Sequence, residues 1–247
     1  MSSLKARLDA EVAKRNDIKE LESADPLIVA RQNPNEYKAL ICALFSYGKA
    51  TKIVEFLESL DFSLLDASEE QIKKSLKGFY YRFQNSEDIA ALFIALRRLK
   101  LEHSLETLFL QNYEPEQNLL AGLFGVIEAI ENIYPFESRG YRFLIGKANQ
   151  KSPYKRWLMY LRWMVRHDAL DLGLWKGVSR KDLLLPLDTH TFKVTQSLGL
   201  LKRKTYDLKA VIEATESLKK FDATDPIKYD FALYRLGQEK DLEVFKA

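Results

Sequence analysis

The sequence predicts an all-α protein. Apolar residues recur three and four positions apart along most of the 247-residue chain, which is the pattern of helices that each bury one face. No segment shows the strict alternation of apolar and polar residues that is typical of a half-buried β-strand. Hydrophobic residues make up 47% of the chain, with only 10 Gly and 7 Pro, which excludes a disordered or fibrous protein. The chain is long enough to bury a substantial core.

The N-terminal half is predicted to contain a series of short helices. Their apolar periodicity covers residues 36–47, 53–60, 69–76, 87–99, 105–110 and 119–130. Ser68 begins a capping-box pattern, with Gln71 three residues later. Ser86 and Ser104 each stand close before an acidic residue and are expected to cap the next helices. Asp25, which a proline follows, is expected to cap another.

A basic helix is predicted from about residue 153 to residue 166. Ser152 would be its cap and Pro153 would occupy its first turn. At the helical repeat, one stripe would carry Lys155, Met159, Arg162 and Arg166. Arg156, Tyr160 and Trp163 would flank this stripe, and the opposite face would be apolar. Such a helix suits the wall of a site for an anionic ligand.

The excess positive charge of the chain is concentrated around this helix. The net charge is +3, but residues 1–137 hold 16 Lys and Arg against 22 Asp and Glu, whereas residues 138–167 hold 8 Lys and Arg and no acid. Residues 168–247 are nearly balanced, with 14 against 13. Composition alone favours a solvated basic face. The alternative is nucleic-acid binding, in which cations neutralise phosphates and aromatic rings stack on bases.

Lys155 is the strongest candidate for a reactive side chain in this segment. It would lie near the N-terminus of the helix, where unpaired N–H groups and the like charge of Arg162 disfavour the ammonium form. Both effects predict a lowered pKa for Lys155, which an amine nucleophile requires. The alternative is a lysine that contacts phosphate or is merely solvated.

A second candidate residue is Asp188. Apolar residues lead into it, and a helix pattern follows with Phe192, Val194 and Leu198 on the buried face. Asp188 is therefore predicted to be an N-cap, with its carboxylate held by backbone N–H groups. A purely structural cap is the simpler interpretation. His190 would orient Asp188, contact phosphate, or only make a local hydrogen bond.

Two further features are predicted to be structural. The segment 225–231 is expected to start a helix with a buried aromatic face, because Asp225 and Asp230 lie five residues apart and do not share a helical face. Cys42 lies in an apolar run and is expected to be a buried, inert thiol.

Several classes of protein are excluded or disfavoured by composition. A single cysteine excludes an intramolecular disulfide, a cysteine-ligated iron–sulfur cluster and a zinc site with several cysteines. No window approaches the roughly 18 apolar residues of a membrane span. Residues 1–15 are charged and helical in pattern, without the apolar core of a signal peptide. We therefore expect a cytoplasmic protein without a cofactor, a metal or a membrane partner.

The segment 186–194, together with residues 198–200, resembles the catalytic-aspartate segment of the helix-hairpin-helix DNA glycosylase superfamily. The resemblance implies a two-lobed all-helical fold with a cleft, an essential carboxylate at Asp188 and, in bifunctional members, a nucleophilic lysine that matches Lys155. The two residues are 33 positions apart, which is nearer to the archaeal 8-oxoguanine glycosylase branch than to the endonuclease III branch. The chain departs from the superfamily in lacking a Leu-Pro-Gly-Val-Gly hairpin before Lys155 and the cluster cysteines. Nearly the whole chain also resembles an uncharacterised bacterial family of unknown function.

The glycosylase resemblance implies a DNA repair enzyme, a base-excision DNA N-glycosylase with AP-lyase activity if Lys155 reaches the sugar, whereas the family of unknown function implies no activity. The alternative is a non-catalytic nucleic-acid-binding protein on the same scaffold. The expected lobes are residues 33–167, ending in the basic helix, and residues 1–32 with 168–247. DNA contacts are expected from Lys147, Lys151, Arg156, Arg162, Arg166 and His190. The candidates for a base pocket are Tyr154, Trp157, Tyr160 and Trp163.

Overall fold

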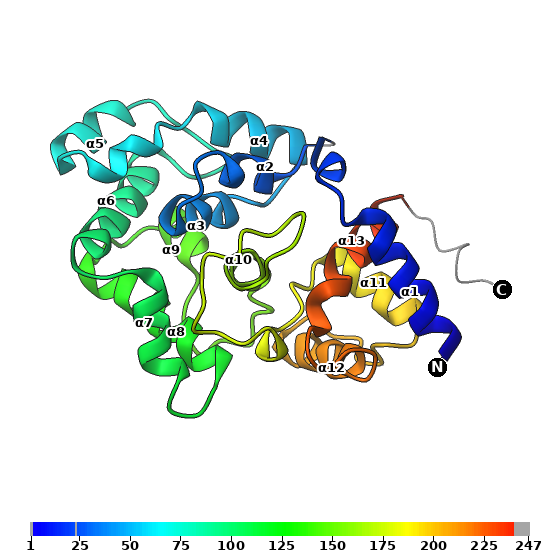
Figure 1. Ribbon diagram of the computed structural model, residues 1–247. Helices are drawn as coiled ribbons and strands as arrows, with labels where there is room; N and C mark the ends of the chain where they lie inside the picture. Colours follow the sequence, from blue (N-terminus) through cyan, green and yellow to red (C-terminus); the bar gives the residue numbers. More distant parts are fainter. Residues whose placement is uncertain (1, 23, 240–247) are drawn as a thin grey trace. The chain divides into compact units, whose positions relative to one another are not determined.

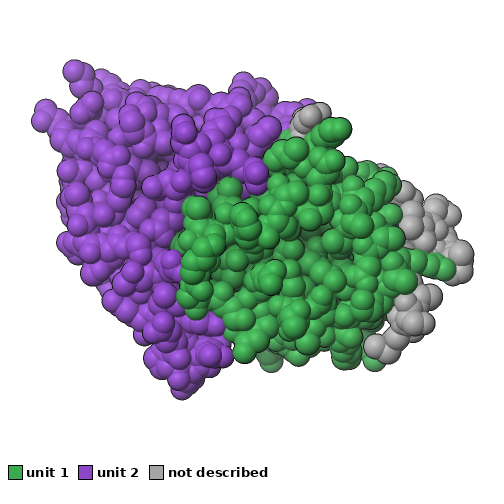
Figure 2. Space-filling view, viewed as in Figure 1, with its two compact units in different colours: residues 1–23, 151–247 green, residues 24–150 purple. Residues whose placement is uncertain are grey.

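The all-α prediction is confirmed by the computed structural model, which describes residues 2–22 and 24–239 (Figure 1). Those residues form α-helices and short 3-10 helices, and among them the only β-type pairs are two isolated bridges, Tyr81 with Gln84 and His167 with Leu172. No helix of the described ranges is long and apolar enough to cross a membrane. The chain divides into unit 1, residues 1–23 and 151–247, and unit 2, residues 24–150 (Figure 2).

Unit 2 is built around two buried helices. It comprises α2 (Pro26–Arg31), α3 (Glu36–Leu44), α4 (Ala50–Ser59), η2 (Phe62–Asp66), α5 (Glu69–Ser75), α6 (Ser86–Glu102), α7 (Leu105–Tyr113), α8 (Leu119–Ile133) and α9 (Arg139–Ile145). Every residue of α3 from Tyr37 to Leu44 is buried, as is the stretch of α6 from Asp88 to Leu96. The remaining helices pack around this core, and Cys42 lies within it with a pKa that burial raises to about 12.

The helix starts follow local cap chemistry. Asp25, Ser68 and Ser104 accept backbone N–H bonds at the N-termini of α2, α5 and α7, as predicted. The prediction for Ser86 is wrong by one residue, because Asn85 is the cap of α6 and Ser86 is its first helical residue. Asn85 forms a reciprocal capping box with Asp88, which satisfies more of the unpaired N–H groups than a serine alone.

Unit 1 joins the two ends of the chain around the basic helix. It comprises α1 (Ser2–Arg15), η1 (Ile18–Glu22), α10 (Lys155–Val165), η3 (Arg180–Asp182), α11 (Thr189–Ser197), α12 (Leu208–Lys219), η4 (Pro226–Tyr229) and α13 (Asp230–Glu239). Helix α13 packs against α11 and α1 (Figure 1). Arg15 fastens α1 to the end of α13, with Nη2 2.7 Å from a carboxylate oxygen of Glu239.

The boundaries of the units differ from the predicted lobes. The sequence predicted a lobe of residues 33–167, whereas unit 2 ends at residue 150 and α10 belongs to unit 1. The physical reason is that α10 carries arginines whose partners are aspartates further along unit 1, as described below. Helix α2 belongs to unit 2, where it packs on α3 and α4. Lys155 and Asp188 consequently lie in the same unit.

Candidate functional site

The basic helix α10 begins at Lys155, two residues later than predicted. Tyr154 precedes it with φ of 47°, in the left-handed region, and makes no side-chain cap. Pro153 therefore lies outside the helix rather than in its first turn. The Lys155 side chain is half-buried and extends toward the next turn, with Nζ 3.3 Å from Sδ of Met159. Because Met159 is one turn before Arg162, the amine leans along the stripe toward that arginine.

The stripe that the sequence predicted to face solvent is buried. The exposed fraction of Arg162 is 5% and that of Arg166 is 8%. Arg162 donates from Nη1 to Oδ2 of Asp230 at 2.5 Å and from Nε to Oδ1 of Asp171 at 3.1 Å. A guanidinium held in this way is not available to a phosphate. The expected contacts of Arg162 and Arg166 with nucleic acid are thus corrected to internal ion pairs.

Arg166 extends the same network. It donates from Nη1 to Oδ2 of Asp171 at 2.6 Å and from Nε to Oδ1 of Asp225 at 3.0 Å. Asp168 lies 2.9 Å from Nη1 and accepts the backbone N–H of Asp171, so it holds that residue in place. Asp171 bridges the two arginines with its two oxygens. We call these residues, with Arg162 and Asp230, the arginine–aspartate network.

Burial raises the pKa values of the carboxylates in the network, whereas ion pairing with the arginines lowers them. Burial raises the pKa of Asp171 to about 6 even though Arg162 and Arg166 both favour its ionised form. Burial also raises the pKa of Asp230, against the effect of Arg162. Burial alone would raise the pKa of Asp168, but Arg166 and two backbone N–H groups lower it overall. The deepest carboxylates therefore depend on their arginines to remain charged.

Asp188 is the N-cap of α11, as predicted. Its Oδ1 accepts the backbone N–H groups of His190 at 2.8 Å and Thr191 at 2.7 Å. Neither of these bonds uses Oδ2, and the side chain is half-exposed. Nearby, Tyr206 donates its hydroxyl to the carbonyl of Leu187 at 2.6 Å. Burial and the charge of Asp188 raise the pKa of Tyr206 to about 12.

The charges of Lys155 and Asp188 both act on Asp230. Asp230 is the first residue of α13 and is 4% exposed. After burial and Arg162, the charge of Asp188 raises the pKa of Asp230 and the charge of Lys155 lowers it. Both side chains are therefore within electrostatic range of one buried carboxylate, although 33 residues separate them in the sequence. We call Lys155, Asp188, Asp230 and Arg162 the lysine–aspartate cluster.

The chain matches one family of known sequences. The family model described as "Protein of unknown function (DUF2400)" matches residues 25–239. The chain belongs to this DUF2400 family. Its match includes every member of the lysine–aspartate cluster. No curated protein and no solved structure matches. The resemblance to an uncharacterised family is thus confirmed.

The other predicted DNA-binding residues of this DUF2400 chain do not all lie in the same unit, and they differ in solvent exposure. Lys147 lies in unit 2 and Lys151 in unit 1, and both are exposed. Arg156 is half-buried on α10. His190 is exposed, with Nδ1 3.3 Å from the carbonyl oxygen of Gly237. His190 therefore contacts α13 through its ring and Asp188 through its backbone N–H group.

The four predicted base-pocket aromatics are packed inside the protein. The exposed fraction is 5% for Tyr154, 4% for Trp157, 1% for Tyr160 and 1% for Trp163. Tyr160 contacts the edges of two tryptophans, with ring centroids 6.3 Å from Trp157 and 5.6 Å from Trp175. These rings offer little surface for stacking, so burial favours a core role for them.

Sequence analysis missed Asp230 and Asp225 as members of the network. The prediction assumed one continuous helix, on which residues five apart do not share a face. The structure places η4 between them, so that each carboxylate reaches a different arginine of α10. Two features of the sequence could have indicated these ion pairs. They are two arginines four residues apart on one helix and two aspartates that flank a Pro-Ile-Lys-Tyr segment.

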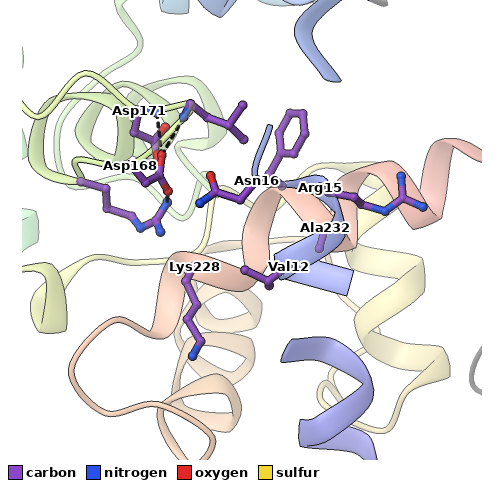
Figure 3. Close-up of a pocket in the computed structure, with 10 residues that line it drawn as sticks. Val12, Arg15, Asn16, Asp168, Asp171, Lys228 and Ala232 are labelled. Carbon is purple, nitrogen blue, oxygen red and sulfur yellow. Dashed lines mark hydrogen bonds and ion pairs between the residues drawn. The ribbon is translucent and has the colours of Figure 1, made fainter. Parts of the chain in front are cut away.

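A small cavity adjoins the arginine–aspartate network (Figure 3). Its lining includes Asn16, which follows α1, together with Asp168, Asp171, Lys228 and Ala232. The cavity has a volume of about 10 Å³, which is room for about one water molecule. The cavity is therefore too small for a substrate. Across the described residues, no group of histidine, cysteine, aspartate and glutamate could hold a metal ion.

Proposed function

We propose that the protein is a base-excision DNA N-glycosylase with an AP-lyase step through Lys155. The observation that carries the proposal is that the charges of both Lys155 and Asp188 act on the pKa of the buried Asp230. A half-buried amine and a half-exposed, fixed carboxylate in one cluster are the two groups that this reaction requires. The resemblance of the Asp188 segment to DNA glycosylases supports DNA as the substrate.

Asp188 would stabilise the sugar as the base departs. Cleavage of the glycosidic bond develops positive charge on the deoxyribose, and a carboxylate held in advance stabilises that charge without reorganising. The two backbone hydrogen bonds fix Oδ1, and Oδ2 is the oxygen that would face the developing cation.

Lys155 would be the nucleophile of the lyase step. Its deprotonated Nζ forms a bond to C1′ while the bond from C1′ to the base breaks, and the base leaves with the electron pair and takes up a proton. Opening of the sugar ring gives a Schiff base between Nζ and C1′. Loss of a proton from C2′ then expels the 3′ phosphate by β-elimination.

Exposed lysines of unit 1 would supply the contacts to DNA in place of Arg162 and Arg166. Unit 1 holds 24 Lys and Arg against 18 Asp and Glu, whereas unit 2 holds 14 against 17. The exposed lysines near α11 include Lys193 on the helix and Lys202 and Lys204 after it. Their charges would neutralise phosphates and make binding depend on salt.

Borohydride trapping on modified oligonucleotides tests the proposal. Duplex and single-stranded substrates that carry oxidised, deaminated or alkylated bases, or an abasic site, are incubated with protein and borohydride. We expect a covalent adduct with the wild type, because borohydride reduces the Schiff base to a stable amine. Lys155→Ala should abolish the adduct. Lys181→Ala is the matched control, since this exposed lysine of unit 1 lies outside α10 and is not among the expected DNA contacts.

Two results would contradict the proposal. One is an adduct that persists in Lys155→Ala. The other is a panel in which no substrate gives an adduct or an abasic site. If the protein still binds DNA in either case, the alternative function of a non-catalytic nucleic-acid-binding protein would be favoured.

A further inference from the structure

A second pocket lies in unit 2. It has a volume of about 550 Å³ and lies between the end of α5, the start of α6 and the segment that follows α8. This volume is within the range of about 300–1,000 Å³ that small-molecule sites occupy. Its floor is formed by Ala90, Ala91 and Ile94 of α6, which are nearly fully buried. Two small side chains in the floor leave room for a flat group.

The walls of this pocket are held in place before any ligand binds. Arg98 donates to both carboxylate oxygens of Glu69, at 2.7 and 3.0 Å, and to the carbonyl of Ile133 at 3.0 Å. Its guanidinium carbon lies 4.8 Å from the centre of the Tyr134 ring. Ser86 accepts the backbone N–H of Gly78 at 2.9 Å, which ties the turn after α5 to the start of α6. Because these side chains are already ordered, less conformational entropy is lost when a ligand binds.

Two aromatic rings line one side of the pocket. Tyr134 and Phe136 are nearly parallel, with an interplanar angle of 10° and ring centroids 6.3 Å apart. Phe136 packs nearly perpendicular to the buried Tyr141, with ring centroids 5.4 Å apart and an interplanar angle of 83°. Both rings are half-buried and lie beside the apolar floor. A planar ring that stacks on one of them is therefore nearly parallel to the other, which favours a flat heterocycle.

The charged side chains that line the pocket indicate which other chemical groups the ligand carries. Lys73 of α5 and Lys77 of the following turn are both exposed and line the pocket. Two lysine side chains at one rim suit a phosphate group. Glu87, in the first turn of α6, lines the same pocket and is an acceptor for an amino group. A flat ring with an amino group and a phosphate is the chemistry of a nucleotide.

We propose that this pocket of unit 2 binds a nucleotide, with the base against Tyr134 and Phe136, an exocyclic amino group at Glu87 and the phosphate at Lys73 and Lys77. The nucleotide is either free or the terminal nucleotide of a strand, since both present the same chemistry. The pocket shares no residue with the lysine–aspartate cluster, so this site is independent of the proposed function.

Calorimetric titration of the full chain with nucleoside monophosphates tests the proposal. The probes are AMP, CMP, IMP and UMP, with a 5′-phosphorylated single-stranded oligonucleotide as a further arm. We expect AMP and CMP to bind tighter than IMP and UMP, because only the first two present an amino group to Glu87. Binding of the monophosphates assigns a free nucleotide, and binding of the oligonucleotide alone assigns a strand end.

Surface variants decide which residues are responsible. Lys73→Gln and Lys77→Gln should each weaken binding several-fold, and their combination by about tenfold. Lys74→Gln is the matched control, because this exposed neighbour of Lys73 lies outside the pocket. Glu87→Gln should reduce the preference for AMP over IMP. All four side chains are exposed, so the fold is retained, which thermal unfolding verifies.

Three outcomes would overturn the proposal. The first is no saturable binding of any probe. The second is equal weakening by Lys74→Gln and Lys73→Gln, which shows a diffuse charge effect. The third is an unchanged preference for AMP over IMP in Glu87→Gln. Failure of this site leaves borohydride trapping at Lys155 unaffected, so the two proposals fail separately.

Discussion

Arg162 and Asp230 form a buried ion pair, with 2.5 Å between Nη1 and Oδ2 and side chains that are each 6% exposed. The pair joins the middle of α10 to the first residue of α13. It lies within electrostatic range of both Lys155 and Asp188. The ion pair that links α10 to α13 is therefore also part of the lysine–aspartate cluster.

Asp230→Ala is expected to destabilise the fold strongly. Removal of one partner leaves the Arg162 guanidinium buried without the Asp230 carboxylate, and breaking a buried pair costs about 3–5 kcal/mol. The free energy of unfolding in urea measures the loss. The double variant Arg162→Met with Asp230→Leu should recover part of it, because the unpaired charge is gone. A loss below about 1 kcal/mol for the single variant would contradict the buried pair.

Substitutions of buried and exposed cations should have different effects on DNA binding. Arg162→Gln and Arg166→Gln should lower stability, because each removes an arginine that pairs with the buried Asp171, while the folded fraction keeps its affinity for DNA. Lys193→Gln and Lys202→Gln should leave stability unchanged and reduce the slope of log affinity against log salt by about 1 each. Salt-dependent binding measured alongside thermal unfolding separates the two groups. Folded arginine variants that lose DNA affinity would show that the network opens to bind phosphate.

Much of the fold could be predicted from local sequence patterns. Helix periodicity and cap residues act over three or four positions, so Asp25, Ser68, Ser104 and Asp188 are recognisable in the sequence alone. The start of α10 was missed because Tyr154 takes a left-handed conformation, which a Ser-Pro pair does not indicate.

The burial of the basic stripe could not be predicted in the same way. A local charge count gives the sign of a segment but not the position of its counter-charges. Asp230 of α13 lies 68 residues after Arg162, and Asp225, the N-cap of η4, lies 59 residues after Arg166. Only the tertiary fold brings these aspartates to α10 and converts a candidate DNA-binding face into an internal network.

Stability should depend on pH through Asp171. Burial raises the pKa of this carboxyl to about 6 from its ordinary value of 3.8, so between these values the folded state binds a proton that the unfolded state does not. A fall in pH from about 7 to 4 therefore stabilises the folded state through this group, by up to about 3 kcal/mol. Asp171→Asn should remove that dependence. Urea unfolding of both proteins across this range measures it. A difference in unfolding free energy between them that is flat or has the opposite sign would contradict a raised pKa.

Asp188 is both a helix cap and the candidate catalytic carboxylate, and two substitutions separate these roles. Asparagine caps helices about as well as aspartate, so Asp188→Asn should keep the bonds to His190 and Thr191 and change stability by less than about 0.5 kcal/mol. Asp188→Ala loses the cap and should cost about 1 kcal/mol. Both variants lack the negative charge and should lose base excision by at least about 100-fold, since electrostatic stabilisation of the developing cation is removed. Single-turnover excision assays and urea unfolding on the same preparations provide the comparison. If Asp188→Asn retains wild-type excision while Asp188→Ala loses both stability and activity, Asp188 is a structural cap and the nucleophile Lys155 acts without it.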